Sequence, residues 1–191
     1  MEGVYFYWFC WLFWIVITFL MPKSKKRTVL AVWLLVIITV SNLYLSFNYI
    51  EISMSFLLII VGSFISISLL SRIGFSIFSA FTIMIGFTSL LIWEAHAPVW
   101  IFMPRLLIIP IICVLLITFI AKGLQKRMTL VTLGLCGGEF LYSVMVSRFS
   151  IRQTIGEREF LDTLLIVLFI LVCLEVIQKG REKFILVIRK A

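Results

Sequence analysis

The stretch Gly134-Leu135-Cys136-Gly137-Gly138-Glu139 lies near the middle of an apolar run over about residues 128–146. A helix of about 20 such residues is long enough to cross a bilayer. Gly134 and Gly138 form a G-x-x-x-G pair, which lets a neighbouring helix approach closely. Glu139 follows directly, at a depth where an ionised group is costly. The stretch therefore predicts a membrane-embedded helix around which the other helices of the chain pack.

The composition of the whole chain indicates the same class of protein. Of 191 residues, 63% are hydrophobic and 14% are charged, and the mean hydropathy is +1.19. A soluble domain has about 45–50% apolar and about 25% charged residues. A membrane β-barrel would need short segments of about 10 residues that alternate in polarity, and the apolar runs here are longer and do not alternate. We therefore expect an all-α, polytopic transmembrane helix bundle.

Seven apolar runs, separated by short polar loops, predict seven transmembrane helices in one domain over residues 1–177. A basic tail over 178–191 follows, and the sequence leaves its structure open. Glu175 lies near the end of the seventh run and Lys179 follows four residues later, an orientation that favours an ion pair. The seven predicted helices cover about residues 3–21, 29–47, 52–70, 75–93, 100–120, 128–146 and 160–177.

The 17 Lys and Arg residues are divided unevenly between the two sets of loops that seven helices create. Three lie in one set (Arg148, Arg152 and Arg158), and Arg105 lies just inside a helix. Loops rich in Lys and Arg remain in the cytoplasm, so we expect the N-terminus outside and the C-terminus cytoplasmic. The other set holds thirteen: Lys23, Lys25, Lys26, Arg27, Arg72, Lys122, Lys126, Arg127, Lys179, Arg181, Lys183, Arg189 and Lys190.

The net charge of +8 does not indicate a nucleic-acid partner. Its basic residues sit in short loops beside apolar runs, which is the placement that membrane topology explains. The expected partner is the lipid bilayer.

Motifs for catalysis and for metal or cofactor binding are missing from the sequence. There is no G-x-S-x-G nucleophile elbow, no H-E-x-x-H zinc pair and no phosphate-binding glycine loop after a strand. No C-x-x-C or Cys/His cluster supports a metal site or a disulfide framework. We therefore expect no metal, no cofactor and no catalytic residue. The four cysteines are interpreted as small apolar fillers: Cys10, Cys113, Cys136 and Cys173.

A few polar and small residues inside the apolar runs are the candidates for function or for helix packing. Glu139 lies near the midplane and Arg105 somewhat nearer the outer surface, so the two side chains could neutralise each other or form a site for a proton, ion or polar ligand. Asn42, in the outer half of the second run, is expected to hydrogen-bond across helices. Small residues predicted at helix contacts are Gly134, Gly138, Gly62, Ser66 and Gly86.

The chain opens with Met1-Glu2-Gly3-Val4-Tyr5-Phe6-Tyr7-Trp8-Phe9, followed by the rest of a Trp-rich helix and a Lys/Arg loop. In this opening, in its length and in its all-helical layout, the chain resembles the YphA-like membrane proteins of Bacillus and relatives. The resemblance implies a bacterial plasma-membrane protein. It brings no activity, cofactor or catalytic residue to positions of this sequence.

Two classes of function fit these observations best. The first is a non-enzymatic scaffold or sensor that works through helix contacts, with other membrane proteins or a second copy of the chain as partners. The second is a small transporter or channel-like carrier that uses Glu139 and Arg105, and a membrane-embedded enzyme comes third. The surroundings of Glu139 discriminate between the first two, because an aqueous cavity favours transport and tight packing favours a scaffold.

Overall fold

The computed structural model describes residues 4–47, 50–70, 73–96, 105–147 and 153–190. Of the side chains in these ranges, those of Phe47, Ile50, Arg105, Gln153 and 182–190 lie outside the description. The part of the predicted fifth helix before Arg105 also falls outside it.

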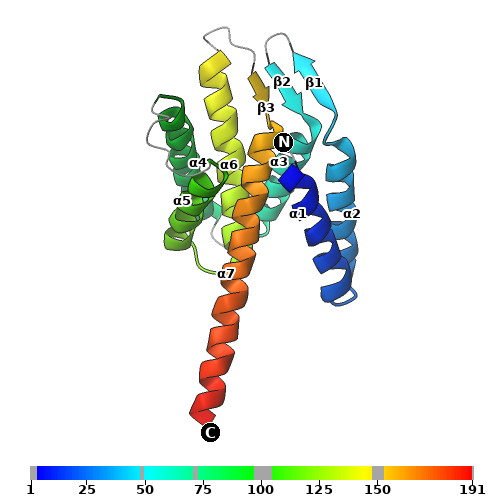
Figure 1. Ribbon diagram of the computed structural model, residues 1–191, viewed down its shortest axis with the longest axis vertical. Coiled ribbons are helices and arrows are strands. Elements are labelled where there is room, and N and C mark those ends of the chain that lie inside the picture. The colour runs from blue at the N-terminus through cyan, green and yellow to red at the C-terminus, as the bar shows by residue number, and fades with distance from the viewer. Residues whose placement is uncertain (1–3, 48–49, 71–72, 97–104, 148–152, 191) are drawn as a thin grey trace.

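The predicted bundle of seven helices is confirmed within the described residues, and Figure 1 shows the helices running between two ends of the molecule. Three of these helices are long and apolar enough to cross a membrane, namely α4, α6 and the Arg158–Arg181 part of α7. A π-helical turn, η1 (Val16–Leu20), extends the first helix. The helices are α1 (Val4–Ile15), α2 (Lys25–Val40), α3 (Met54–Ser68), α4 (Ile73–His96), α5 (Arg105–Ile120), α6 (Leu124–Ser147) and α7 (Arg158–Lys190).

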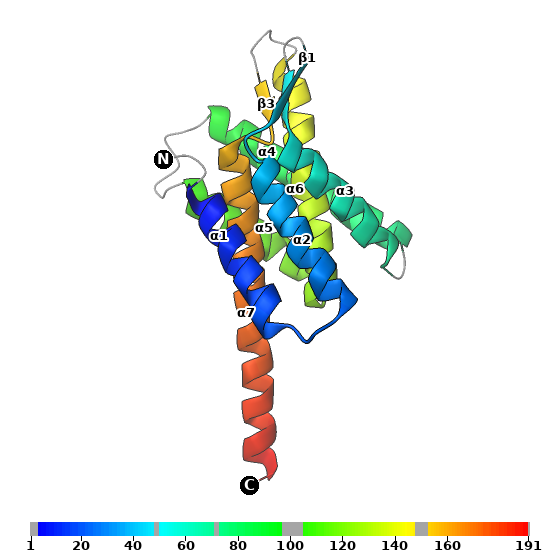
Figure 2. The same ribbon diagram turned by 90° about the vertical axis from the view of Figure 1, so that its right-hand side faces the viewer.

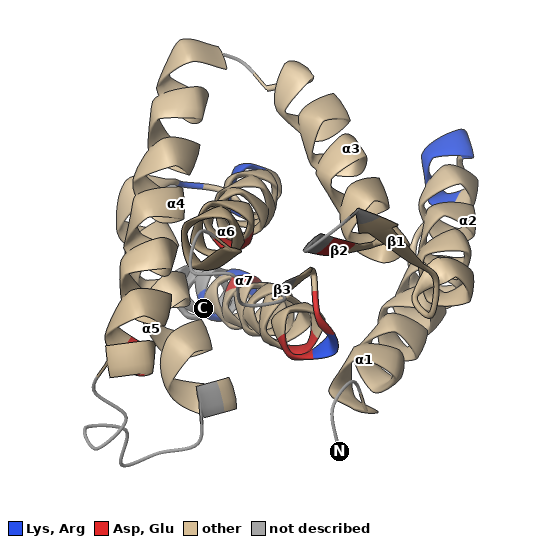
Figure 3. Ribbon diagram, turned by 90° about the horizontal axis from the view of Figure 1, so that it is seen from above, with Lys and Arg blue, Asp and Glu red and all other residues tan. Residues whose placement is uncertain are grey.

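Helix α6, which carries the glycine-rich stretch, lies at the centre of the bundle. It contacts α3, α4, α5 and α7, and the view from above in Figure 3 shows it surrounded by α3, α4 and α7. Its most extensive neighbour is α4, whereas α5 packs mainly on α7. The α1–α2 pair joins the rest through contacts of α1 with α7 and of α2 with α3. The central position of α6 explains why so many of its side chains are buried.

A small three-stranded sheet, which the sequence analysis did not predict, covers the end of the bundle where α1 begins (Figure 1). Strand β1 (Tyr44–Phe47) pairs antiparallel with β2 (Ile50–Ser53), and β2 pairs parallel with β3 (Gln153–Ile155). The structure therefore differs from the predicted helix over 29–47, because α2 ends at Val40 and the chain continues as a strand. Aromatic and branched residues in this segment favour a strand once a partner strand is present.

Glycine is required where β3 leads into α7. Gly156 has φ +74°, a conformation that side-chain-bearing residues rarely adopt, and it is buried. A Cβ atom at this position would overlap the side chain of Phe56 in the first turns of α3. The turn thus packs against α3 only because residue 156 has no side chain.

Helix α7 extends well beyond the rest of the bundle, at the end opposite the sheet (Figures 1 and 2). Its 33 residues span about 50 Å at 1.5 Å per residue. The predicted ion pair is confirmed, since Lys179 Nζ lies 3.3 Å from Glu175 Oε1. The segment 178–190, whose structure the sequence left open, continues α7 without a break.

Candidate functional site

The parallel packing of α4 on α6 is the closest helix contact around the candidate residues. A Cβ atom at Gly134 would lie 2.6 Å from Ile83 Cγ2 and 3.0 Å from the Ala80 carbonyl oxygen, and one at Gly138 would lie 2.8 Å from Phe87 Cδ1 and 3.0 Å from the Met84 carbonyl oxygen. The two glycines therefore let the backbones of α4 and α6 approach to a distance that no other residue type permits.

A polar bond joins the same two helices. The Thr88 hydroxyl of α4 donates to the carbonyl oxygen of Gly138 on α6 at 3.1 Å, and it also lies 2.9 Å from the Met84 carbonyl oxygen in its own helix. Thr88 is buried. The single hydroxyl hydrogen is therefore shared between an acceptor in its own helix and one on α6, which adds a polar contact between the two helices.

Glu139 follows the glycine contact and is 8% exposed. It lies on a different side of α6 from Gly134 and Gly138, since successive residues of a helix are rotated by about 100°. Arg105 is the first residue of α5, and its side chain lies outside the described residues, so the Glu139–Arg105 contact remains a prediction.

The other small residues singled out in the sequence occupy separate contacts. Gly62 of α3 faces Trp33, whose Nε1 would lie 3.2 Å from an added Cβ atom. Gly86 of α4 faces Leu116 of α5, whose Cδ1 would lie 3.1 Å from a Cβ atom added at Gly86. Ser66 is half-buried on α3. Gly62 and Gly86 therefore meet different helices, and these positions do not form one site.

Asn42 lies in the turn after α2, at the sheet end of the bundle, and is exposed. Its Oδ1 accepts hydrogen bonds from the Tyr7 hydroxyl at 3.2 Å and from Arg158 Nη2 at 3.1 Å. Tyr7 Oη is also 2.9 Å from Ser41 Oγ. Asn42 thus joins the turn after α2 to α1 and α7, three segments that are far apart in the sequence.

A second polar contact ties α1 to α7 below this junction. The backbone N–H of Phe6 donates to Asp162 Oδ1 at 2.5 Å, and Asp162 is 2% exposed. The first N–H groups of a helix have no partner within it. A carboxylate in α7 therefore caps the N-terminus of α1, where the positive end of the helix dipole favours a negative charge.

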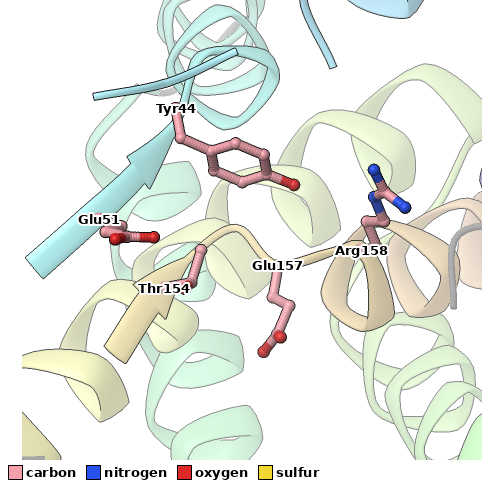
Figure 4. A pocket seen from close by; sticks show the side chains of 5 residues that line it. All are labelled: Tyr44, Glu51, Thr154, Glu157 and Arg158. Atoms are coloured by element: carbon pink, nitrogen blue, oxygen red, sulfur yellow. The ribbon is translucent and has the colours of Figure 1, made fainter. Parts of the chain in front are cut away.

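A cavity of about 210 Å³ lies beside this junction, lined by Tyr44, Glu51, Thr154, Glu157 and Arg158 (Figure 4). These five residues come from β1, β2 and the segment from β3 into α7. Glu139 does not line it. The cavity is polar, because each of its lining residues carries a charged group or a hydroxyl.

Of the residues of the junction and the cavity, only Asn42 was singled out from the sequence. No pattern in the neighbouring sequence predicts the contacts of Tyr7, Arg158 and Asp162, because their partners lie far away in the chain. One local signal was present: Ile50, Glu51, Ile52 and Ser53 alternate in polarity, which is typical of a half-buried strand. No group of residues able to hold a metal ion occurs in the described part of the chain.

The side chains on the outside of the bundle define the class of protein. Large apolar residues are widely exposed, among them Phe19 at 74%, Phe78 at 69% and Phe119 at 89%. Soluble proteins rarely expose apolar surface on this scale, whereas lipid covers it in a membrane. Together with the apolar helices that are long enough to cross a bilayer, this surface is that of a helical integral membrane protein.

Comparison with known proteins gives the family. The sequence matches the YphA-like integral membrane protein family over residues 2–191, so the chain belongs to that family. It is 25% identical over 165 residues to a Bacillus subtilis (strain 168) protein described as uncharacterized protein YphA, with 85% of this chain and 81% of that protein covered. No solved structure matches the chain. The resemblance seen in the opening residues is confirmed over nearly the whole length.

Proposed function

We propose that the protein is a multi-pass scaffold or sensor of the bacterial plasma membrane that works through contacts between helices. The observation that carries the proposal is the close packing of α6 against α4, where Gly134 and Gly138 leave no room for added atoms. A helix held this closely is suited to maintain a fixed surface for a partner. The cavity at the sheet end is lined by residues of β1, β2 and the segment from β3 into α7, and Glu139 does not line it.

The proposal includes the orientation of the chain in the membrane and the number of times that the chain crosses it. Seven crossings over residues 1–177 would put the sheet end outside and the basic segment 178–191 in the cytoplasm. The α1–α2 and α5–α6 connections lie at the end of the molecule where α7 extends (Figures 1 and 2). Most Lys and Arg residues belong to that end in the sequence, which supports a cytoplasmic location for it.

The native Cys136 offers a direct test, because it lies three residues before Glu139 on α6 and is fully buried. A variant that retains Cys136 and carries alanine at positions 10, 113 and 173 would be treated with a small hydrophilic thiol reagent. We expect no reaction in the folded protein and full reaction after unfolding in detergent. A matched variant that retains only Cys173, which is half-buried, reports whether the reagent reaches the protein. Reaction of Cys136 in the folded state would contradict the scaffold and favour transport.

A carrier that uses Glu139 and Arg105 is the second candidate, because an ionisable residue buried in a membrane helix commonly marks an ion or proton pathway. If the two side chains form a pair, Glu139→Gln destabilises the protein by leaving Arg105 without its counter-charge. Adding Arg105→Gln then restores part of the loss. Unfolding measurements on both single variants and the double variant test this, and additive effects would show that the residues do not interact.

A further inference from the structure

The walls of the sheet-end cavity follow from strand geometry. Glu51 and Thr154 are register partners on β2 and β3, so their side chains project from the same face of the sheet. Tyr44 pairs with Ser53, two residues from Glu51, and therefore shares that face. On the opposite face Ile155 is 1% exposed and packs into the core. Because side chains along each strand alternate between the two faces, the sheet has an apolar face toward the bundle and a polar face toward the cavity.

The remaining wall comes from the start of α7. Figure 4 shows the Tyr44 ring extending from β1 toward Arg158 and the Glu51 carboxylate lying across the cavity from that arginine. Arg158 has five N–H donors, and its bond to Asn42 anchors the guanidinium. The N-terminus of α7 adds a partial positive charge on the same side. Glu51 therefore lies on one side of the cavity and Arg158 on the other, and the Glu157 carboxylate also lines the wall beside Arg158.

We propose that this cavity binds a small zwitterion, with its primary ammonium group at Glu51 and its anionic group at Arg158 and the start of α7. A primary ammonium donates three hydrogen bonds, which suit the Glu51 carboxylate and the Thr154 hydroxyl, and the Tyr44 hydroxyl lies on the Arg158 side of the cavity. The cavity has a volume of about 210 Å³. It is smaller than the range of about 300–1,000 Å³ typical of drug-sized ligands, so the ligand is compact.

Two sources supply this chemistry at the surface of a membrane. One is the phosphoethanolamine headgroup of a bilayer lipid, and the other is a free amino acid. Both carry a primary ammonium close to an anion. Because Arg158 also holds Asn42, the ligand binds next to the junction of α1, α2 and α7. Binding of a zwitterion does not require that the bundle act as a scaffold. A negative binding result therefore leaves the scaffold proposal intact, and the reverse also holds.

The test measures binding to the full chain in nanodiscs of phosphatidylcholine and phosphatidylglycerol. Phosphoethanolamine and glycine are titrated by calorimetry, with phosphocholine as the counterpart that lacks N–H donors. In a second arm, phosphatidylethanolamine replaces part of the phosphatidylcholine, and the shift of the unfolding temperature is recorded. We expect saturable binding of a primary-ammonium probe in at least one arm. A response to phosphoethanolamine or to phosphatidylethanolamine identifies the lipid headgroup as the source, and a response to glycine alone identifies a free amino acid.

Glu51→Gln should weaken that binding about tenfold or more, the usual effect of losing a hydrogen bond to a charged group. Glu175→Gln is the matched control, since it removes a carboxylate at the distant end of α7 and should leave binding unchanged. Glu51→Asp keeps the charge but shortens the side chain, and serves if Glu51→Gln does not fold; binding should again fall several-fold. No saturable binding in either arm, equal binding of phosphocholine, or an unaffected Glu51 variant overturns the proposal.

Discussion

The contact of Gly134 with α4 allows a stability prediction whose size follows from the structure. In Gly134→Ala the new methyl group would lie 2.6 Å from Ile83 Cγ2 and 2.7 Å from Ile83 Cβ, in a position where Ile83 itself is buried. The third neighbour is the Ala80 carbonyl oxygen at 3.0 Å, which belongs to the backbone and cannot rotate away. The helices must therefore separate to accept the substitution.

Two opposing terms set the magnitude. Overpacking of a filled core costs about 1–3 kcal/mol, and the close backbone contact puts this site in the upper half of that range. Replacing glycine by alanine inside a helix returns about 1 kcal/mol. The expected net loss in the free energy of unfolding is roughly 1–2 kcal/mol.

Gly180→Ala is the matched control for this prediction. Gly180 lies in the extended part of α7, and an added Cβ atom there meets nothing within 4 Å. The same substitution should therefore be neutral or stabilise by up to about 1 kcal/mol. Unfolding would be followed by circular dichroism in mixed micelles with increasing sodium dodecyl sulfate. Equal stability of the Gly134 and Gly180 variants would refute the inference that Gly134 sets the α4–α6 distance.

Three further predictions test other parts of the fold. Gly156→Ala should destabilise by about 2–4 kcal/mol in the same unfolding assay, because it combines a positive φ with overlap on Phe56; a change below about 0.5 kcal/mol, the usual range for surface substitutions, would contradict this. Asp162→Ala should cost about 1–3 kcal/mol, because the Phe6 N–H loses its buried acceptor, whereas Asp162→Asn, which keeps an acceptor oxygen, should cost less. In intact cells a membrane-impermeant maleimide should label Thr154→Cys and not Lys25→Cys, since the proposed topology puts them on opposite sides; the reverse pattern would invert the topology.

The sequence determined the class of fold because the length and hydropathy of each apolar run decide by themselves whether that run can cross a bilayer. A run that must cross lipid has to satisfy its own backbone hydrogen bonds, so it forms a helix wherever it packs. The ion pair of Glu175 with Lys179 was predictable for a similar reason, because the two residues are one helical turn apart in the same segment. The G-x-x-x-G pair was also readable, because its spacing places both glycines on one face of α6.

Only the tertiary structure decided which helix meets that glycine face and what forms at the sheet end. The partner is α4, which precedes α6 in the chain with α5 between them, and no pattern within either helix encodes that choice. Strand β3 pairs with β2 about 100 residues earlier. Residues 44–47 form a strand because β2 supplies the backbone partners that a helix would otherwise supply. Asp162 and Arg158 acquire their contacts with Phe6 and Asn42 in the same way. Contacts between segments far apart in the sequence depend on many weak interactions across the whole fold. The sequence around any one residue therefore does not specify which distant segment it meets.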